Sequence, residues 1–205
     1  MKFHQFISYV FHPVLVPMAT TLWFFILAPV YIPKLFAYRI LLFIFILTYL
    51  VPLILLVLLK KMNLITNYQL PTIKERKFPV LFTATVYFLV GNLLLNTHVL
   101  NLLAFSFFGY ALSLIMVYIL FSKNIKTSLH IIGITGIITF FGLLSYSFKA
   151  NYLILIACSF IMLGIVATSR LKLEAHSIKE IITGTILGIA TQLFGFGLYV
   201  YFYSM

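Results

Sequence analysis

Apolar residues gather into seven long runs that are separated by short polar stretches. Each run approaches or exceeds the ~20 residues that an α-helix needs to cross a bilayer. Backbone polar groups must be satisfied inside lipid, and the runs show no strand-like alternation, so we expect helices. The pattern predicts an all-α fold, a polytopic membrane helix bundle with six or seven transmembrane helices. The runs cover about 13–32, 38–59, 79–96, 99–121, 129–148, 152–168 and 181–202.

Composition supports this prediction and leaves room for one domain. The chain is 63% hydrophobic and 8% charged, whereas a soluble domain is about 25% charged. At 205 residues we expect a single integral-membrane domain over 1–205, with the lipid bilayer as its main partner. The first residues lack a small-residue cleavage site, so we expect them to lead directly into a span. The single Cys158 excludes a disulfide framework and a thiolate metal site.

Three polar loops are predicted to open on the same side of the membrane. They lie at 67–79, 122–130 and 169–180, after the second, fourth and sixth apolar runs. Two histidines, His130 and His176, each lie just at the start of an apolar run on this side. Ionisable groups at membrane helix ends that face a bundle interior are usually functional. These loops therefore form the candidate site.

The remaining three histidines are expected to lie outside the candidate site. His4 and His12 lie near the amino-terminal edge, where the membrane interface suits amphipathic side chains. His98 lies in a short turn on the opposite side. We do not expect these three residues to take part in the site.

The stretch SRLKLEAHSIKEIITG, residues 169–184, contains the strongest chemical signal. The chain has three Glu and no Asp, yet Glu180 follows His176 by four residues. On a helix that spacing places both side chains on one face, so Glu180 can accept a hydrogen bond from the ring of His176. Such a carboxylate fixes the tautomer and raises the basicity of the other ring nitrogen, as a nucleophile or general base requires.

Basic and hydroxyl side chains on the same side suit a phosphate group. Arg170, Arg76 and Lys74 supply charged donors, and Ser128 supplies a hydroxyl beside a predicted helix amino terminus. The scarcity of carboxylates argues against a Mg²⁺ or two-metal site, so no metal or cofactor is expected. Other basic residues on this side fit membrane anchoring equally well, namely Lys77, Lys123, Lys126 and Lys172.

These motifs resemble those of the type-2 phosphatidate phosphatase superfamily, which includes lipid phosphate phosphatases and vanadium haloperoxidases. Its third signature resembles S-R-x5-H with an acid and a Gly at successive intervals of four, here Ser169, Arg170, His176, Glu180 and Gly184. Its second, P-S-G-H, resembles T-S-L-H at 127–130, which lacks the Pro and the Gly. Its first, K-x6-R-P, is echoed with different spacing in 74–79. The resemblance covers roughly 67–190.

The resemblance implies a metal-independent phosphatase that acts on a membrane lipid phosphate. His176 would attack phosphorus and form a phosphohistidine, Glu180 would orient its ring, and His130 would protonate the leaving group. The substrate would be phosphatidate, phosphatidylglycerol phosphate, a polyprenyl diphosphate or lipid A. Residues expected to hold the phosphate oxygens are Arg170, Ser128, Ser169, and Lys74 or Arg76.

A second hypothesis is a catalytically inactive superfamily member that binds lipid or serves a transport function. The altered first and second motifs favour it. A proton-coupled transporter fits less well, because the predicted spans contain no acid and no inverted repeat is visible. The lipid and the oligomeric state stay open at this point.

The net charge of +11 concerns orientation rather than nucleic-acid binding, because the basic residues lie in short loops beside lipid headgroups. Eleven of the 14 Lys and Arg residues fall on the side with the three polar loops. Seven against three remain when Lys74, Arg76, Lys77 and Arg170 are set aside. The positive-inside rule predicts a cytoplasmic site in a bacterial inner membrane and an exported carboxyl terminus, although many proteins of the resembling family act on the outer side.

Overall fold

The computed structural model describes residues 2–68 and 70–203, and every regular element in this part of the chain is helical. Seven helical stretches within it are long and apolar enough to span a membrane. The protein is therefore a multi-pass membrane helix bundle, as predicted. In order, its elements are α1 (Lys2–Val10), η1 (Pro13–Leu15), α2 (Val16–Leu27), α3 (Lys34–Phe45), η2 (Ile46–Leu50), α4 (Val51–Lys61), α5 (Ile73–Leu94), η3 (His98–Leu100), α6 (Asn101–Ser122), α7 (Leu129–Phe148), α8 (Leu153–Lys172) and α9 (Ile178–Tyr203).

The first two spans are interrupted beside prolines. Proline lacks an N–H and disfavours helical geometry in the residue before it. Accordingly, His12 before Pro13 is extended, with ψ at 134°, and α1 is separated from α2. In the second span, the π-helical turn η2 ends at Leu50, two residues before Pro52. The prediction of a first segment over 13–32 is thus wrong in its bounds, because this span begins at Lys2 and ends at Leu27.

Two other boundaries matter for the site. The third and sixth segments were predicted at 79–96 and 152–168, but α5 already begins at Ile73 and α8 continues to Lys172. Arg76 and Arg170 therefore lie in helical turns rather than in flexible loops. Their backbones are fixed, and so is the direction in which each side chain leaves its helix.

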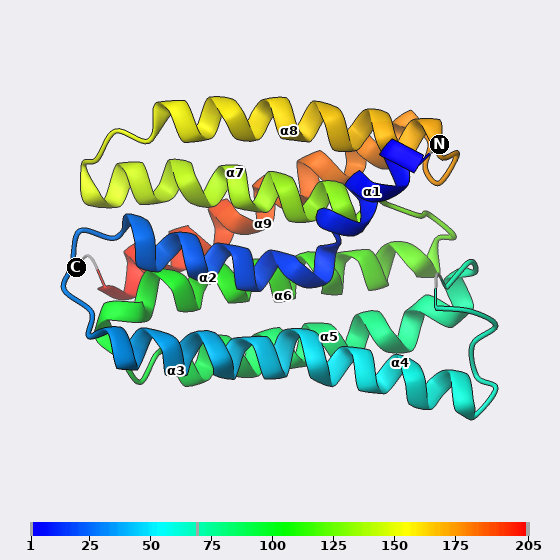
Figure 1. The fold of residues 1–205 in the computed structure, drawn as a ribbon, viewed down its shortest axis with the longest axis horizontal. Coiled ribbons are helices and arrows are strands. Elements are labelled where there is room, and N and C mark those ends of the chain that lie inside the picture. Colours follow the sequence, from blue (N-terminus) through cyan, green and yellow to red (C-terminus); the bar gives the residue numbers. More distant parts are fainter. Residues whose placement is uncertain (1, 69, 204–205) are drawn as a thin grey trace.

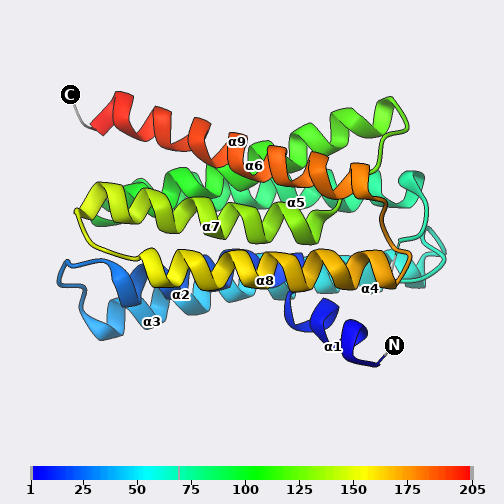
Figure 2. The same cartoon turned by 90° about the horizontal axis from the view of Figure 1, so that it is seen from above.

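The three polar loops meet at one end of the bundle. Figure 1 shows the amino terminus and the connections α4–α5, α6–α7 and α8–α9 at the right-hand end, with the carboxyl-terminal end of α9 at the left. Within the bundle, α6 packs against α5 and α9, and α7 packs against α8 and α9. The short α1 lies against the carboxyl-terminal part of α8, as Figures 1 and 2 both show. The site sits at this end.

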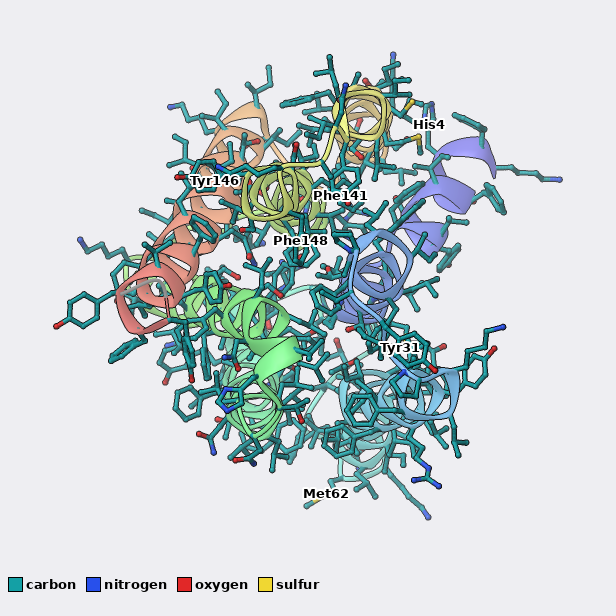
Figure 3. The ribbon with its side chains drawn as sticks, turned by 90° about the vertical axis from the view of Figure 1, so that its left-hand side faces the viewer. His4, Tyr31, Met62, Phe141, Tyr146 and Phe148 are labelled. Carbon is teal, nitrogen blue, oxygen red and sulfur yellow. The ribbon has the colours of Figure 1, made fainter. Side chains whose placement is uncertain are left out.

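The apolar core lies between α5, α6, α7 and α9. Phe107 of α6 and Phe140 of α7 are completely buried, and Phe141 lies inside the ring of helices in Figure 3. By contrast, α8 exposes large apolar side chains such as Ile154 and Ile161. Outward apolar side chains on a membrane span face lipid, which gives the bundle a lipid-facing rim around a packed centre.

Close approach between α9 and α7 fixes the position of the site's loops. A Cβ added to Gly188 would lie 2.0 Å from the Thr135 hydroxyl and 2.7 Å from the Ile132 carbonyl. One added to Gly184 would lie 3.0 Å from the Ser128 carbonyl. Only glycine allows the two backbones to come so near. The amino-terminal ends of α7 and α9 are therefore held side by side.

Candidate functional site

His176 and Glu180 form a pair at the start of α9. The Ser177 hydroxyl accepts a hydrogen bond from the Glu180 amide at 3.4 Å, which caps the helix. Glu180 lies in the first turn, where the helix dipole favours a negative charge. His176 lies in the preceding loop rather than on the helix, and its Nδ1 donates to Glu180 Oε2 at 2.5 Å. The predicted hydrogen bond is present, and it leaves Nε2 with a lone pair.

The environment of His176 favours its neutral form. Only 5% of its side chain is exposed. Burial lowers the pKa of His176 below its ordinary value, the hydrogen bond and charge of Glu180 oppose this shift, and the positive charges of Arg170 and Arg76 reinforce it. At neutral pH the ring is therefore uncharged, with its proton on Nδ1, as a nucleophilic Nε2 requires.

His130 occupies the first turn of α7, close to this pair. Its side chain is buried, and its Nε2 donates to the backbone carbonyl of Ser8 at 3.1 Å. The His130 ring is within electrostatic range of Arg170 and His176. A hydrogen bond from Nε2 to a carbonyl leaves Nδ1 as the nitrogen available for proton exchange. The structure thus brings together the two histidines that the sequence singled out.

Ser128 lies at the amino-terminal cap of α7 and is completely buried. Its amide donates to the Glu180 carbonyl at 3.3 Å, as does the Thr127 hydroxyl at 3.2 Å. Among the described residues, its own hydroxyl has no hydrogen-bond partner, and it does not cap the helix. A buried polar atom without a partner is costly in a native structure, unless a water or ligand satisfies it. The amino terminus of α7 beside it is suited to an anion.

Arg170 extends from the last turn of α8 into the same region and is half-buried. Its Nη1 donates to the Ser8 hydroxyl at 3.1 Å, whereas its Nε is buried without a partner in the part of the chain that the structure describes. Guanidinium groups bind carboxylate and phosphate through two parallel N–H donors. The Nε side of Arg170 is therefore free to hold an oxyanion.

The structure separates the two basic residues proposed from α5. Arg76 is half-buried and within electrostatic range of Glu180, Arg170 and His176. Lys74 is exposed. Residues two apart on an α-helix point about 200° apart, so Lys74 and Arg76 cannot both face the site. Arg76 joins the cluster, and Lys74 does not.

Ser169 is buried beside the cluster, but its hydroxyl is already engaged. It donates to the Ile165 carbonyl at 2.8 Å. Because its single hydrogen is used there, it accepts from His4 Nδ1 at 3.0 Å. Ser169 therefore links α8 to α1 rather than presenting a free donor.

Three polar residues of the amino-terminal segment were missed by the sequence analysis. His4 contacts Ser169, Ser8 contacts both Arg170 and His130, and the His12 ring packs edge-on against His130 with centroids 5.5 Å apart. These residues are spaced by four, which places His4 and Ser8 on one face of α1. That spacing was the available signal.

Positive charge outweighs negative charge in this cluster. Arg76 and Arg170 are half-buried and close enough to repel each other, and Glu180 is the carboxylate beside them. Like charges held together in a poorly solvated place favour binding of an anion. Within the described residues, no three His, Cys, Asp or Glu side chains come together as a metal site would require. The arrangement can hold an oxyanion next to a neutral imidazole.

No protein-family model matches this chain, and the searches of curated proteins and of solved structures find no match either.

Proposed function

We propose that this protein is a metal-independent membrane lipid phosphatase that acts through a phosphohistidine intermediate. One observation carries the proposal. Within residues 2–68 and 70–203, Arg170 Nε and the Ser128 hydroxyl are both buried without partners, close to a neutral His176 whose Nδ1 is held by Glu180. Two unsatisfied donors beside a prepared nucleophile suit a phosphate group. The motif resemblance points to the same chemistry.

In the proposed reaction, His176 Nε2 attacks phosphorus while the bond to the lipid oxygen, or to the leaving phosphate of a diphosphate, breaks. His130 gives a proton to that oxygen from Nδ1, a proton that the ring takes up once the bound phosphate offsets the neighbouring positive charge of Arg170. Glu180 stabilises the positive charge that develops on His176. Water then attacks the phosphohistidine, His130 takes back a proton, and inorganic phosphate leaves with His176 restored.

Charge stabilisation would come from the side chains and helix end described above. Arg170, Arg76, the Ser128 hydroxyl and the amides that begin α7 would hold the non-bridging oxygens. Preorganised donors of this kind are usually the largest single contribution to such catalysis. The site's place at one end of the bundle suits a substrate with its phosphate at headgroup level and its chains in the bilayer. Candidate substrates are phosphatidate, phosphatidylglycerol phosphate, a polyprenyl diphosphate and lipid A.

The orientation of the protein in the membrane is part of the same proposal. The charge count favours a site that faces the cytoplasm of a bacterial inner membrane. A reporter fused to the carboxyl terminus tests this directly, because a seven-span chain with a cytoplasmic site has an exported carboxyl terminus. A cytoplasmic reporter signal would contradict it.

Phosphate release by the purified protein in lipid nanodiscs, with EDTA present, tests the activity. The four candidate lipids are assayed with the wild-type protein, with His176→Ala and with His98→Ala. We expect release from at least one lipid, a loss on the order of 10⁴-fold or more in His176→Ala, and an unchanged rate in His98→Ala, whose histidine is exposed in η3 between α5 and α6, away from the site.

A different result would favour the non-enzymatic alternative. If no lipid releases phosphate, and if vanadate binding is the same in His176→Ala as in the wild type, the phosphatase proposal fails. The altered second motif, in which Leu129 stands where the family has Gly, would then indicate a lipid-binding protein without catalysis.

A further inference from the structure

The short helix α1 turns one face to the bundle and the other away from it. Ile7 and Ser8 are buried, while Phe3, Phe6 and Tyr9 are exposed. The inward face lies on α8, where the His4–Ser169 hydrogen bond fastens it. This arrangement places Ser8 directly beside the candidate phosphate site.

The end of α1 frees the backbone carbonyl of Ser8. The last four carbonyls of an α-helix lack partners within the helix, and α1 ends at Val10 because Pro13 prevents its continuation. The Ser8 carbonyl therefore stays available and accepts the His130 Nε2 hydrogen at 3.1 Å. An acceptor at Nε2 orients the ring and leaves Nδ1 for proton transfer.

The Ser8 side chain holds a second residue of the site. Its hydroxyl accepts from Arg170 Nη1 at 3.1 Å, while Arg170 Nε stays buried with no partner among the described residues. A hydrogen bond at Nη1 fixes the plane of the guanidinium and leaves its Nε side directed at a ligand. Each Ser8 oxygen thus contacts a different member of the site.

We infer that Ser8 is a positioning residue of the phosphate site, holding His130 through its carbonyl and Arg170 through its hydroxyl. The effect of Ser8 on turnover rests on the proposed function. Its contacts with His130 and Arg170 can be measured without turnover. The amino-terminal segment then completes the site, although it contains none of the three motifs.

The hydroxyl contact is tested with Ser8→Ala, with Ser8→Thr as the conservative rescue, and with Ser113→Ala as the control. Ser113 is also buried, but its hydroxyl bonds to the carbonyl of Tyr110 in its own helix. We expect Ser8→Ala to raise both KM and the Kd for vanadate about tenfold, with a smaller effect on kcat, because Arg170 loses its support. Ser8→Thr restores both values, and Ser113→Ala leaves them unchanged.

A double variant separates positioning from general loss of structure. Because Ser8 acts through Arg170, adding Ser8→Ala to Arg170→Ala should weaken vanadate binding no further. Fully additive losses, or a Ser8→Ala variant with the wild-type Kd, would overturn the role of the hydroxyl.

The carbonyl contact is tested by ¹⁵N NMR of histidine-labelled full-length protein, with His130→Gln used to assign the signal. We expect the neutral ring of His130 in the Nε2–H form, and the Nδ1–H form would overturn the inference. If no lipid is hydrolysed but vanadate binds and Ser8→Ala weakens it, the phosphatase proposal fails while the positioning role stands. If the wild type does not bind vanadate at all, both fail.

Discussion

The two ends of the bundle contain similar kinds of residues but place their charges differently. At the end opposite the site, Lys34, Arg39 and Lys149 are all exposed. At the site end, Arg76 and Arg170 are half-buried and close enough to repel each other, and Arg76 also interacts with the charge of Glu180. Exposed cations at membrane boundaries are solvated and interact with headgroups. Half-buried cations close together favour binding of an anion, so the placement of charge as well as its number distinguishes the end with the candidate site.

Polar groups also serve different purposes at the two ends. At the opposite end, the Tyr152 hydroxyl donates to the Leu27 carbonyl at 2.6 Å, and Asn151 Oδ1 caps α8 at the Leu153 amide. Among the described residues, buried unpartnered oxygens away from the site belong to Asn101, Ser147 and Gln192, all of which are neutral. At the site end, Arg170 Nε and the Ser128 hydroxyl are unpartnered and can donate to an anion, and Glu75 Oε2 is unpartnered as well. The charged donor of Arg170 is therefore what separates the two ends.

Removal of His130, the proposed proton donor, should reduce turnover strongly. His130→Ala should lower kcat on a lipid phosphate by about 10²–10⁴-fold, the usual contribution of general acid catalysis. The loss should be much smaller with p-nitrophenyl phosphate, whose leaving group needs little protonation. Steady-state kinetics on both substrates test this. Equal losses on both would contradict the role of His130 as acid and leave a general structural effect.

A smaller loss of kcat/KM is expected for Arg170 at the site end, with Arg39 at the opposite end as the comparison. Arg170→Ala should lower kcat/KM by about 10²–10³-fold, because an oxyanion loses a preorganised donor. Arg39→Ala, at the exposed opposite end, should leave it within about twofold. Phosphate release and vanadate binding measure both variants. Similar losses in the two variants would remove the proposed difference between the ends.

A pH profile tests the pairing of Glu180 with His176. The reaction needs neutral His176, so the rate falls as the pH drops through the pKa of that ring. Glu180 raises this pKa, so Glu180→Gln should move the acid limb of the profile to lower pH. The plateau rate should also fall about tenfold, because the tautomer is no longer fixed. An acid limb that moves to higher pH, or does not move, contradicts the pairing.

The smallest effects are expected in vanadate binding, when Arg76 and Lys74 of α5 are each replaced. Arg76→Ala should weaken vanadate binding about tenfold, since one charge near the anion is lost. Lys74→Ala should change it less than about twofold, because this side chain is exposed and points away. Titration of vanadate into the two variants at equal ionic strength makes the comparison. A larger effect from Lys74 would mean that α5 presents the other face to the ligand.

The sequence predicted much of the fold, because long apolar runs determine where a chain crosses lipid. The seven spans and the shared side of the three loops follow from them. Boundaries failed where polar residues continue a helix beyond its apolar run, as at Arg76 and Arg170. An apolar run indicates which residues lie in the bilayer, but it does not indicate where the helix ends. Helix ends depend on capping residues such as Thr72, whose hydroxyl accepts from the Glu75 amide at 3.3 Å.

The site was predicted where its contacts are local and missed where they are distant. His176 and Glu180 are four residues apart, and the hydrogen bond predicted from that spacing is present although His176 precedes α9. Ser8 meets His130 and Arg170 across more than 120 positions, and no local pattern indicates such a contact. Which of Lys74 and Arg76 faces the site also depended on where α5 begins, and the sequence did not indicate that position.

The proposed phosphatase activity depends on a covalent phosphohistidine on His176. Brief incubation with a ³²P-labelled lipid phosphate, followed by alkaline quenching and peptide mapping, detects this intermediate. We expect an acid-labile, base-stable label on the peptide containing His176, retained in His98→Ala and absent in His176→Ala. Label on another residue, or turnover of the lipid without any labelled histidine, would contradict it.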